Sequence, residues 1–495
     1  MHARVRARRS PARRRPPPRH GRRRRAGPVP RQPAPHRHRG PEPGRRVVSA
    51  ALARRRLLGY GIGSVGTGVF SAVPGLLLLY YLTDVLGVSA AIAGAVLVVP
   101  KAWDVVLNPI VGAASDREAV RTGRRTRLLL VGGATLPFLF AAMFAVPVDS
   151  PGFGAGWAAV TFLLAASAFA CFQVPYVALP AEISDLPSER GRAMAWRVVC
   201  LTVGILVAGG LAPALSDSAG GGRAGYALMG AVIGVVMGAA LITSALANRW
   251  IPSTPGPRPL GLAAALRAAR GNRPFFALLG GYAAHTLAVA IMLAGAPYVA
   301  TYRLDDYGLT SAMFVCMVGP SAFAVPLWRK MSVRYGIVPC YVTALAMFAV
   351  TGFASYPAIS SGSRPGVLVL AGLTGVCYAA VQLFPLSLLP ETVHADKGRT
   401  GQAQAGAFTG LWTAAETGAL ALGPGVFALV LAVSSFRSSD LDEPVHQTGS
   451  ALTGLTVGFT IIPALLFLLA VPLLLAYRRL AAAHRTSEEA QPHAV

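Results

Sequence analysis

Apolar residues run along most of the chain in blocks separated by short polar stretches. A block of about 20 apolar residues crosses the hydrocarbon core of a bilayer as a single α-helix. The pattern predicts twelve spanning helices, at residues 57–82, 90–113, 128–147, 155–178, 193–215, 225–248, 274–299, 309–329, 336–356, 366–389, 403–433 and 452–477. Several contain Gly or Pro, which membrane helices tolerate because neighbouring helices satisfy the freed backbone groups. We therefore predict an all-α, multi-pass membrane protein.

Polar segments between these blocks divide the chain into parts. Disorder is expected at 487–489 and throughout the Arg- and Pro-rich N-terminal segment 1–56, whose stretch 1–46 is of low complexity. Three interpretations of it stay open: a non-native start, a cytosolic tail on anionic lipid, or a nucleic-acid-binding arm. A six-helix bundle is expected at 57–248 and a second one at 274–477. A basic, Pro-rich cytoplasmic loop at 249–273 joins them, and 478–495 form a cytoplasmic tail.

Positive charge is distributed unevenly along the chain. The net charge is +26, and residues 1–56 contribute most of it through 20 Arg and one acid. The remainder is only weakly basic, so we expect a lipid bilayer and a small molecule as partners, and no nucleic acid. Among the predicted loops, 20 basic residues lie on one side and four on the other. Because cytoplasmic loops carry the excess of Lys and Arg, both termini are predicted to lie in the cytoplasm, at the cytoplasmic (inner) cell membrane.

A short motif occurs twice, after the fourth and after the tenth predicted span. Residues 175–185 and 385–396 both contain Pro, three residues, Leu-Pro and then acids. Such spacing is expected of two six-helix bundles related by an axis along the membrane normal, with a substrate site between them near mid-membrane. The chain is therefore predicted to consist of two six-helix pseudo-repeats.

Two further motifs resemble those of known transporters. Residues 112–117 (Gly-Ala-Ala-Ser-Asp-Arg), followed by Gly-Arg-Arg at 123–125, resemble the cytoplasmic signature loop of the major facilitator superfamily. Residues 80–87 (Tyr-Tyr-Leu-Thr-Asp-Val-Leu-Gly) and 101–109 (Lys-Ala-Trp-Asp-Val-Val-Leu-Asn-Pro) resemble the glycoside–pentoside–hexuronide:cation symporter (melibiose permease-like) family. The resemblance implies the major facilitator fold and secondary active transport by a monomer. It implies no cofactor, only a coupling cation, H⁺ or Na⁺.

The signature loop and the first copy of the repeated motif define a candidate cytoplasmic gate. Gly112 would permit close approach of helices, and Asp116 would hold an Arg across the gate. The alternative is a solvated loop without a gating role. The candidate gate residues are Gly112, Asp116, Arg117, Gly123, Arg124, Arg125, Glu182, Asp185 and Arg190.

Charged side chains inside predicted spans mark a candidate substrate and cation pathway, because such groups are costly in a bilayer unless they serve a function. Lys101 and Asp104 are three residues apart on one helix face, and Asn108 lies four beyond Asp104. The alternative is a static ion pair that holds helices together. His285, a lone histidine in a span, could serve packing or proton relay. The candidate pathway residues are Lys101, Trp103, Asp104, Asn108, Gln173, Arg197, Trp412 and Glu416.

Comparison with the melibiose permease-like family changes which coupling cation and which substrate we expect. Positions where its sugar- and cation-binding members carry acids align with Gly68, Asn108 and Gln173 in this chain, and an aromatic position aligns with Val177. Na⁺ favours several hard oxygen ligands, whereas a single carboxyl can carry a proton. H⁺ is therefore favoured over Na⁺, with Asp104 or Glu416 as the carrier.

Together these features predict a secondary transporter, not an enzyme. The first hypothesis is cation-coupled import of a sugar or related small solute by alternating access. The alternative is a proton-coupled exporter of a hydrophobic or amphipathic metabolite or drug, favoured by apolar residues such as Val177. A membrane scaffold or membrane enzyme is a third hypothesis, disfavoured by the gate motif and the charges inside the spans.

Overall fold

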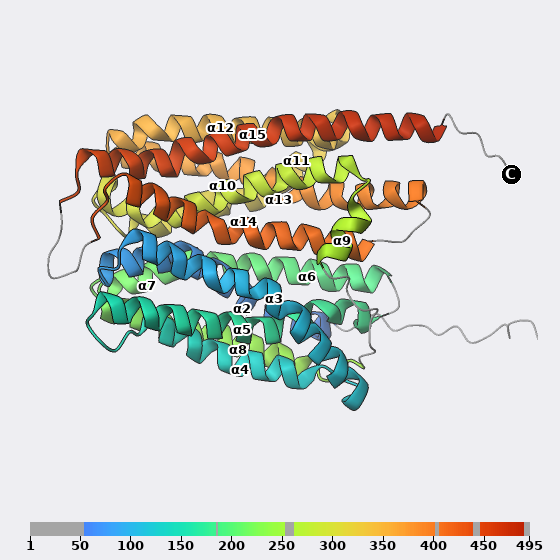
Figure 1. The fold of residues 1–495 in the computed structure, drawn as a ribbon, viewed down its shortest axis with the longest axis horizontal. Helices are drawn as coiled ribbons and strands as arrows, with labels where there is room; N and C mark the ends of the chain where they lie inside the picture. The colour runs from blue at the N-terminus through green and yellow to red at the C-terminus, as the bar shows by residue number, and fades with distance from the viewer. Residues whose placement is uncertain (1–53, 185–186, 253–261, 401–404, 439–445, 490–495) are drawn as a thin grey trace, which may run out of the picture. The chain divides into compact units, whose positions relative to one another are not determined.

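The computed structural model describes residues 54–184, 187–252, 262–400, 405–438 and 446–489. Within them, twelve helical segments are long and apolar enough to cross a membrane, as the hydropathy pattern predicts. The described part of the chain is nearly all helical, and the long helices run side by side (Figure 1).

The first bundle contains the first six spans. Its elements are α1 (Arg54–Gly61), α2 (Gly63–Val73), η1 (Pro74–Leu78), η2 (Tyr81–Val85), α3 (Ala90–Thr122), α4 (Thr126–Phe144), α5 (Pro151–Ile183), α6 (Pro187–Leu206), η3 (Val207–Leu211), α7 (Ala212–Ser218) and α8 (Arg223–Ala247). The π-helical turn η1 begins at Pro74, whose ring supplies no backbone N–H for a regular helical turn. The first span is therefore interrupted near the end that approaches the second bundle.

The second bundle contains the other six spans. Its elements are α10 (Arg273–Leu304), α11 (Leu309–Tyr335), α12 (Ile337–Ser360), α13 (Arg364–Thr400), α14 (Ala405–Val433) and α15 (Gly449–Glu489). The segment between the bundles includes a short helix, α9 (Leu262–Ala269), which packs against α14.

Several helices continue past the predicted ends of their spans. Helix α3 runs to Thr122, so the stretch 112–117 expected in a loop is helical. Most of the first repeated motif lies inside α5, the second lies inside α13, and α15 continues through part of the predicted tail. Disorder predicted at 54–56 and 487–489 is wrong for the same reason. Hydropathy detects the apolar part of a helix, whereas polar turns beyond the bilayer continue the same backbone hydrogen bonding.

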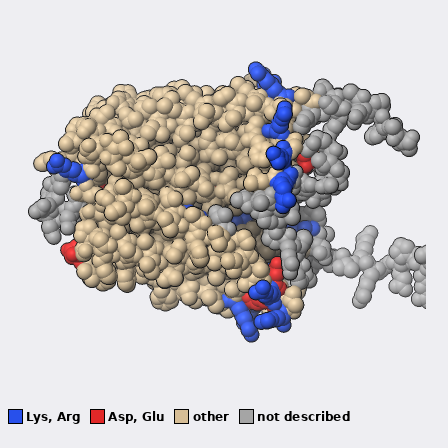
Figure 2. Space-filling model, viewed as in Figure 1, with Lys and Arg blue, Asp and Glu red and all other residues tan. Residues whose placement is uncertain are grey.

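The two ends of the helices differ in charge. Many Lys and Arg side chains gather where α3, α11 and α15 end (Figure 2). We call this the basic end, and it carries the connections at 123–125, 248–252 and 270–272. The opposite, far end carries the connections at 145–150, 219–222, 305–308 and 361–363. The predicted loop asymmetry thus corresponds to two opposite ends of the helices.

The two bundles pack together at the far end. Elements η1 and η3 of the first bundle contact α10 and α11 of the second, and α3 contacts α14. One apolar core extends from the first bundle into the far-end halves of α10, α11 and α14, whereas a second core lies within the second bundle and α9. At Gly209 of η3, an added Cβ would lie 2.0 Å from the Phe314 ring, so this contact requires a glycine.

Candidate functional site

Lys101 and Asp104 form an ion pair on α3. The Lys101 Nζ lies 3.8 Å from Asp104 Oδ2 and 5.9 Å from the centre of the Phe70 ring. Asp104 is only 6% exposed, and its Oδ1 has no hydrogen-bond partner among the described residues. A buried carboxylate is stable only when paired, and here the pairing leaves one oxygen unengaged. The predicted i,i+3 pair is therefore present with a free acceptor.

Three other predicted pathway residues make no hydrogen bond to the Lys101–Asp104 pair among the described residues. The Trp103 Nε1 donates to Ser167 Oγ of α5 at 3.0 Å, so Trp103 joins two helices of the first bundle. Asn108 is exposed, and Gln173 is half-buried with an Oε1 that lacks a partner among the described residues. No hydrogen bond to Asp104 from either amide occurs in the described part of the chain.

Arg197 of α6 and Glu416 of α14 are opposite charges contributed by the two bundles. The Arg197 guanidinium carbon lies 5.9 Å from the centre of the Tyr176 ring. Among the described residues these two charges form no ion pair within 4 Å and interact only over a longer distance. The Tyr176 hydroxyl donates to the Tyr60 carbonyl at 2.7 Å, and the two rings stack at 4.8 Å. The Arg197 cation therefore lies beside a stacked aromatic pair of the first bundle.

Trp412 is not an open platform for a sugar ring in this conformation. It is buried and stacks on Tyr282, with ring centroids 4.0 Å apart. Tyr282 in turn lies beside Glu416. His285 is also buried, and a 2.9 Å hydrogen bond joins its Nδ1 and the Tyr341 hydroxyl, which supports the packing interpretation. These aromatic contacts hold α10, α12 and α14 around Glu416.

The candidate gate is centred on Arg125, which is 5% exposed at the start of α4. Its Nη1 donates to Ser115 Oγ at 2.7 Å and to Asp116 Oδ1 at 2.8 Å, and its Nε donates to Glu182 at 3.2 Å. All four residues belong to the first bundle. The expected Asp116–Arg pair therefore exists, but it joins α3, α4 and α5 of one bundle and does not cross between bundles.

The remaining gate candidates have simpler roles. Gly123 ends α3 with a φ of 67°, a conformation that glycine adopts without strain. An added Cβ at Gly112 would make only an ordinary 3.8 Å contact with Val174, so close helix approach does not require this glycine. Arg117 and Arg124 are exposed, Arg190 is half-buried, and Asp185 lies outside the described residues.

Two polar residues with clear partners were not anticipated from the sequence. Glu118 accepts the backbone N–H groups of Arg127 and Leu128, at 2.7 and 3.1 Å, and so caps α4. Asp84, in η2, is 5% exposed and accepts hydrogen bonds from Thr83 and from Tyr302 of the second bundle. The motif at 80–87 contains Asp84, but this residue follows the predicted end of the first span. It is therefore expected from the sequence to lie in a solvent-exposed loop.

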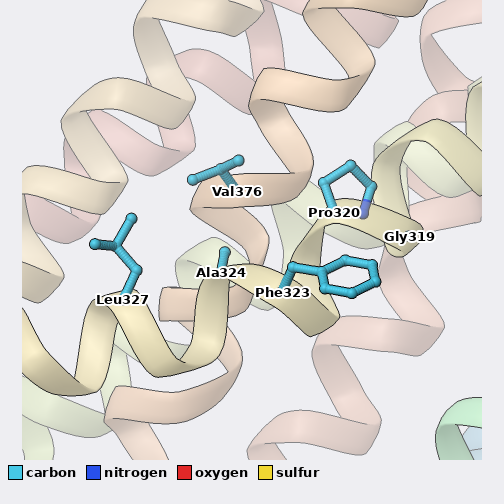
Figure 3. Close-up of a pocket in the computed structure, with 6 residues that line it drawn as sticks. All are labelled: Gly319, Pro320, Phe323, Ala324, Leu327 and Val376. Atoms are coloured by element: carbon cyan, nitrogen blue, oxygen red, sulfur yellow. The ribbon is translucent and has the colours of Figure 1, made fainter.

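A pocket between α11 and α13 is entirely apolar in its lining. Figure 3 shows the side chains that line it, which are Gly319, Pro320, Phe323, Ala324, Leu327 and Val376. It contains no charged or hydrogen-bonding side chain. The pocket therefore suits an apolar group rather than a polar solute.

Twelve membrane-spanning helices arranged in two bundles are the architecture of a membrane transporter. The sequence profile of the family described as MFS/sugar transport protein matches residues 59–478, and the chain belongs to this family. It is a multi-pass membrane protein and not an enzyme.

Comparisons with individual proteins agree with this assignment. The chain is 24% identical to the glucuronide carrier protein homolog of Escherichia coli (strain K12), over 86% of this chain and 92% of that protein. It is 26% identical to a putative sulfoquinovose importer of Salmonella typhimurium, over 73% of this chain and 78% of the relative. The crystal structure of the nucleoside transporter NupG matches with a TM-score of 0.59 and 13% identity, over 86% of this chain and 99% of that one, which shows the fold.

Proposed function

We propose that this protein is a proton-coupled importer of a negatively charged sugar derivative. The observation that carries the proposal is the Arg197 guanidinium of the first bundle, whose buried Nε has no hydrogen-bond partner among the described residues. The opposite charge on the second bundle is Glu416 of α14. An anionic solute that binds Arg197 competes with Glu416, and so changes the interaction between the bundles. Substrate binding and bundle movement are then linked through one cation.

The sugar class is supported by the relatives. One is named for a glucuronide and another for sulfoquinovose, and both compounds are sugars that carry an anionic group. A guanidinium recognises carboxylate and sulfonate oxygens through paired N–H donors. We infer that Arg197 supplies this recognition in the present chain.

Proton coupling is supported by the surroundings of Asp104. Its Oδ2 faces Lys101, and its Oδ1 is buried without a partner among the described residues. A proton occupies one oxygen atom, whereas Na⁺ requires several oxygen ligands around it. The side chain of Asn108 is exposed and does not complete such a set. One unengaged carboxylate oxygen therefore suits H⁺ better than Na⁺.

The conformation supports alternating access with the basic end open. The bundles contact each other at the far end through η1, η3 and α3. Lys and Arg excess marks the cytoplasmic side, so we assign the basic end and both termini to the cytoplasm of a cell membrane. The proposed transporter acts as a monomer.

The experiment is uptake into proteoliposomes with two radiolabelled probes, methyl β-D-glucuronide and methyl β-D-glucoside, which differ in the carboxylate. We expect an acid-outside pH gradient to concentrate the glucuronide and an imposed Na⁺ gradient to leave it at equilibrium. Preference for the neutral glucoside would contradict the role of Arg197, and accumulation driven only by Na⁺ would contradict proton coupling.

Two variants assign these roles to residues. Asp104→Asn should abolish accumulation under a pH gradient and retain exchange of labelled for unlabelled glucuronide, because exchange needs no net proton movement. Arg197→Gln should reduce the preference for glucuronide over glucoside by about tenfold or more, the equivalent of one charge-assisted hydrogen bond. Asp149→Asn is the matched control, since Asp149 is an exposed acid at the far end paired with Arg223.

The second candidate, a proton-coupled exporter of an amphipathic compound, rests on the exposed apolar surface. Val177 is 47% exposed on α5, and the pocket of Figure 3 is apolar throughout. For this function, a pH gradient with the acid side outside would drive the lipophilic dye rhodamine 6G out of the alkaline vesicle lumen. Dye export without glucuronide uptake would favour the second candidate.

A further inference from the structure

The far end contains a polar cluster that joins the two bundles. Its first-bundle members are Tyr80, Thr83 and Asp84, and its members on α10 are Tyr298, Thr301 and Tyr302. The Tyr80 hydroxyl lies 3.0 Å from Thr301 Oγ1, and the Thr83 Oγ1 lies 2.6 Å from the Tyr298 hydroxyl. Asp84 accepts from Thr83 and from Tyr302. Every one of these cross-bundle contacts must break if the far end is to open.

Asp84 is the only acid in this cluster, and it has no cation beside it among the described residues. Of the arginines at the far end, Arg303 donates to Thr456 and to the Leu452 carbonyl, Arg364 donates to the Leu304 carbonyl, and the side chain of Arg437 is exposed. Arg223 pairs with Asp149.

The ionisable groups that face the Asp84 carboxyl are hydroxyls of tyrosines. They come from its own segment, from α8 and from α10, and they are Tyr80, Tyr226, Tyr298 and Tyr302. None of them carries positive charge. A charged Asp84 is therefore buried with hydrogen bonds but without a counter-ion, an arrangement that favours the neutral acid.

We propose that Asp84 is a second proton-binding site, separate from Asp104, and that binding of a proton there stabilises closure of the far end. The inference rests on the proposed alternating access, but not on the identity of the solute or the coupling cation. A proton bound at Asp84 enters and leaves from the far side and does not cross the membrane.

The direction of the pH effect follows from linkage. Asp84 follows the first spanning helix, Arg54–Leu78, and burial raises its pKa to about 7 in the closed far end. In an open, hydrated far end the pKa returns to about 4. The closed state then binds more protons than the open state. The extra stability that the proton gives to the closed state is therefore complete below about pH 4 and is lost as pH rises to about 7. The open-to-closed ratio should rise about tenfold per pH unit in this window and level off above it.

Asparagine reproduces the hydrogen bonds of the protonated acid. Its amide oxygen can accept from Tyr302, and its amide nitrogen can donate to Thr83 Oγ1. The Thr83 hydroxyl can then donate to the Leu79 carbonyl, which lies 3.2 Å away. Asp84→Asn should therefore fold and keep the far end closed without responding to pH.

The experiment measures the distance across the far end by double electron–electron resonance. Spin labels are placed at Ser218→Cys in the first bundle and Ser361→Cys in the second, both exposed positions, after the five native cysteines are changed to Ala. Full-length protein in lipid nanodiscs is titrated from pH 4 to pH 9 without solute. Hydrogen–deuterium exchange of residues 79–89 in the protein with native cysteines repeats the titration without labels.

We expect the long-distance population to grow between about pH 4 and 7 in the wild type and to be pH-independent in Asp84→Asn. Asp149→Asn and Asp104→Asn should respond like the wild type. Tyr302→Phe removes a hydrogen bond that lowers the pKa of Asp84, so its response should extend to higher pH. A wild-type response in Asp84→Asn, or an unshifted response in Tyr302→Phe, would overturn the proposal. Loss of the response in Asp104→Asn would assign the effect to the transport site.

Discussion

The packing of Gly209 against Phe314 at the far end predicts a substitution that should shift the conformational equilibrium. An alanine Cβ at Gly209 would lie 2.0 Å from Phe314 Cδ1. Carbon atoms normally approach to about 3.5–4.0 Å, so η3 and α11 would have to separate by about 1.5 Å or more. Phe314 is buried and has little room to move away.

The expected magnitude of this effect is large enough to measure. Overpacking of this kind costs about 1–3 kcal/mol, and the cost applies only while the far end is closed. Opening the far end removes the clash, so Gly209→Ala should increase the open-to-closed ratio about 5- to 150-fold.

The assay is the same distance measurement across Ser218 and Ser361, at a fixed pH of 5. Gly319→Ala is the control, because Gly319 lies on α11 and a Cβ there would meet no atom within 4 Å. Circular dichroism would establish that both variants are folded. If Gly209→Ala and Gly319→Ala give the same distance distribution, the far-end contact does not hold this conformation and the reasoning is wrong.

Two predictions concern the stability of the first bundle at the basic end. Arg125→Ala removes the buried guanidinium that joins Asp116 and Glu182 and should destabilise the protein by about 3 kcal/mol, seen as a lower melting temperature in detergent. Arg124 is exposed, so Arg124→Ala should have the melting temperature of the wild type. Equal melting temperatures of the two variants would contradict a role of Arg125 in joining α3, α4 and α5. Glu118→Ala removes the side chain that caps α4 and should cost about 1 kcal/mol. Faster hydrogen exchange confined to the first turn of α4 would demonstrate it, and unchanged exchange would refute it.

The sequence predicts the spans well because membrane helices must be apolar over a fixed length. It predicts the Lys101–Asp104 pair because residues three apart share a helix face, and that rule depends only on local geometry. The pairing of Arg125 with Glu182 joins the ends of two helices, so no local spacing indicates it.

Asp84 illustrates what hydropathy cannot detect. The residue follows an apolar block, and its burial is completed by Tyr302 of the second bundle. A window along the sequence counts it as a polar residue after a span. Only the packing of the two bundles reveals that the carboxyl is enclosed.

If solute entry is coupled to proton entry, the solute alone should carry protons into a vesicle. This is tested by adding methyl β-D-glucuronide to proteoliposomes that have no ion gradient and contain the pH-sensitive dye pyranine. We expect the lumen to acidify on addition of the solute in the wild type but not in Asp104→Asn. Uptake of labelled glucuronide by the wild type without any acidification would contradict it.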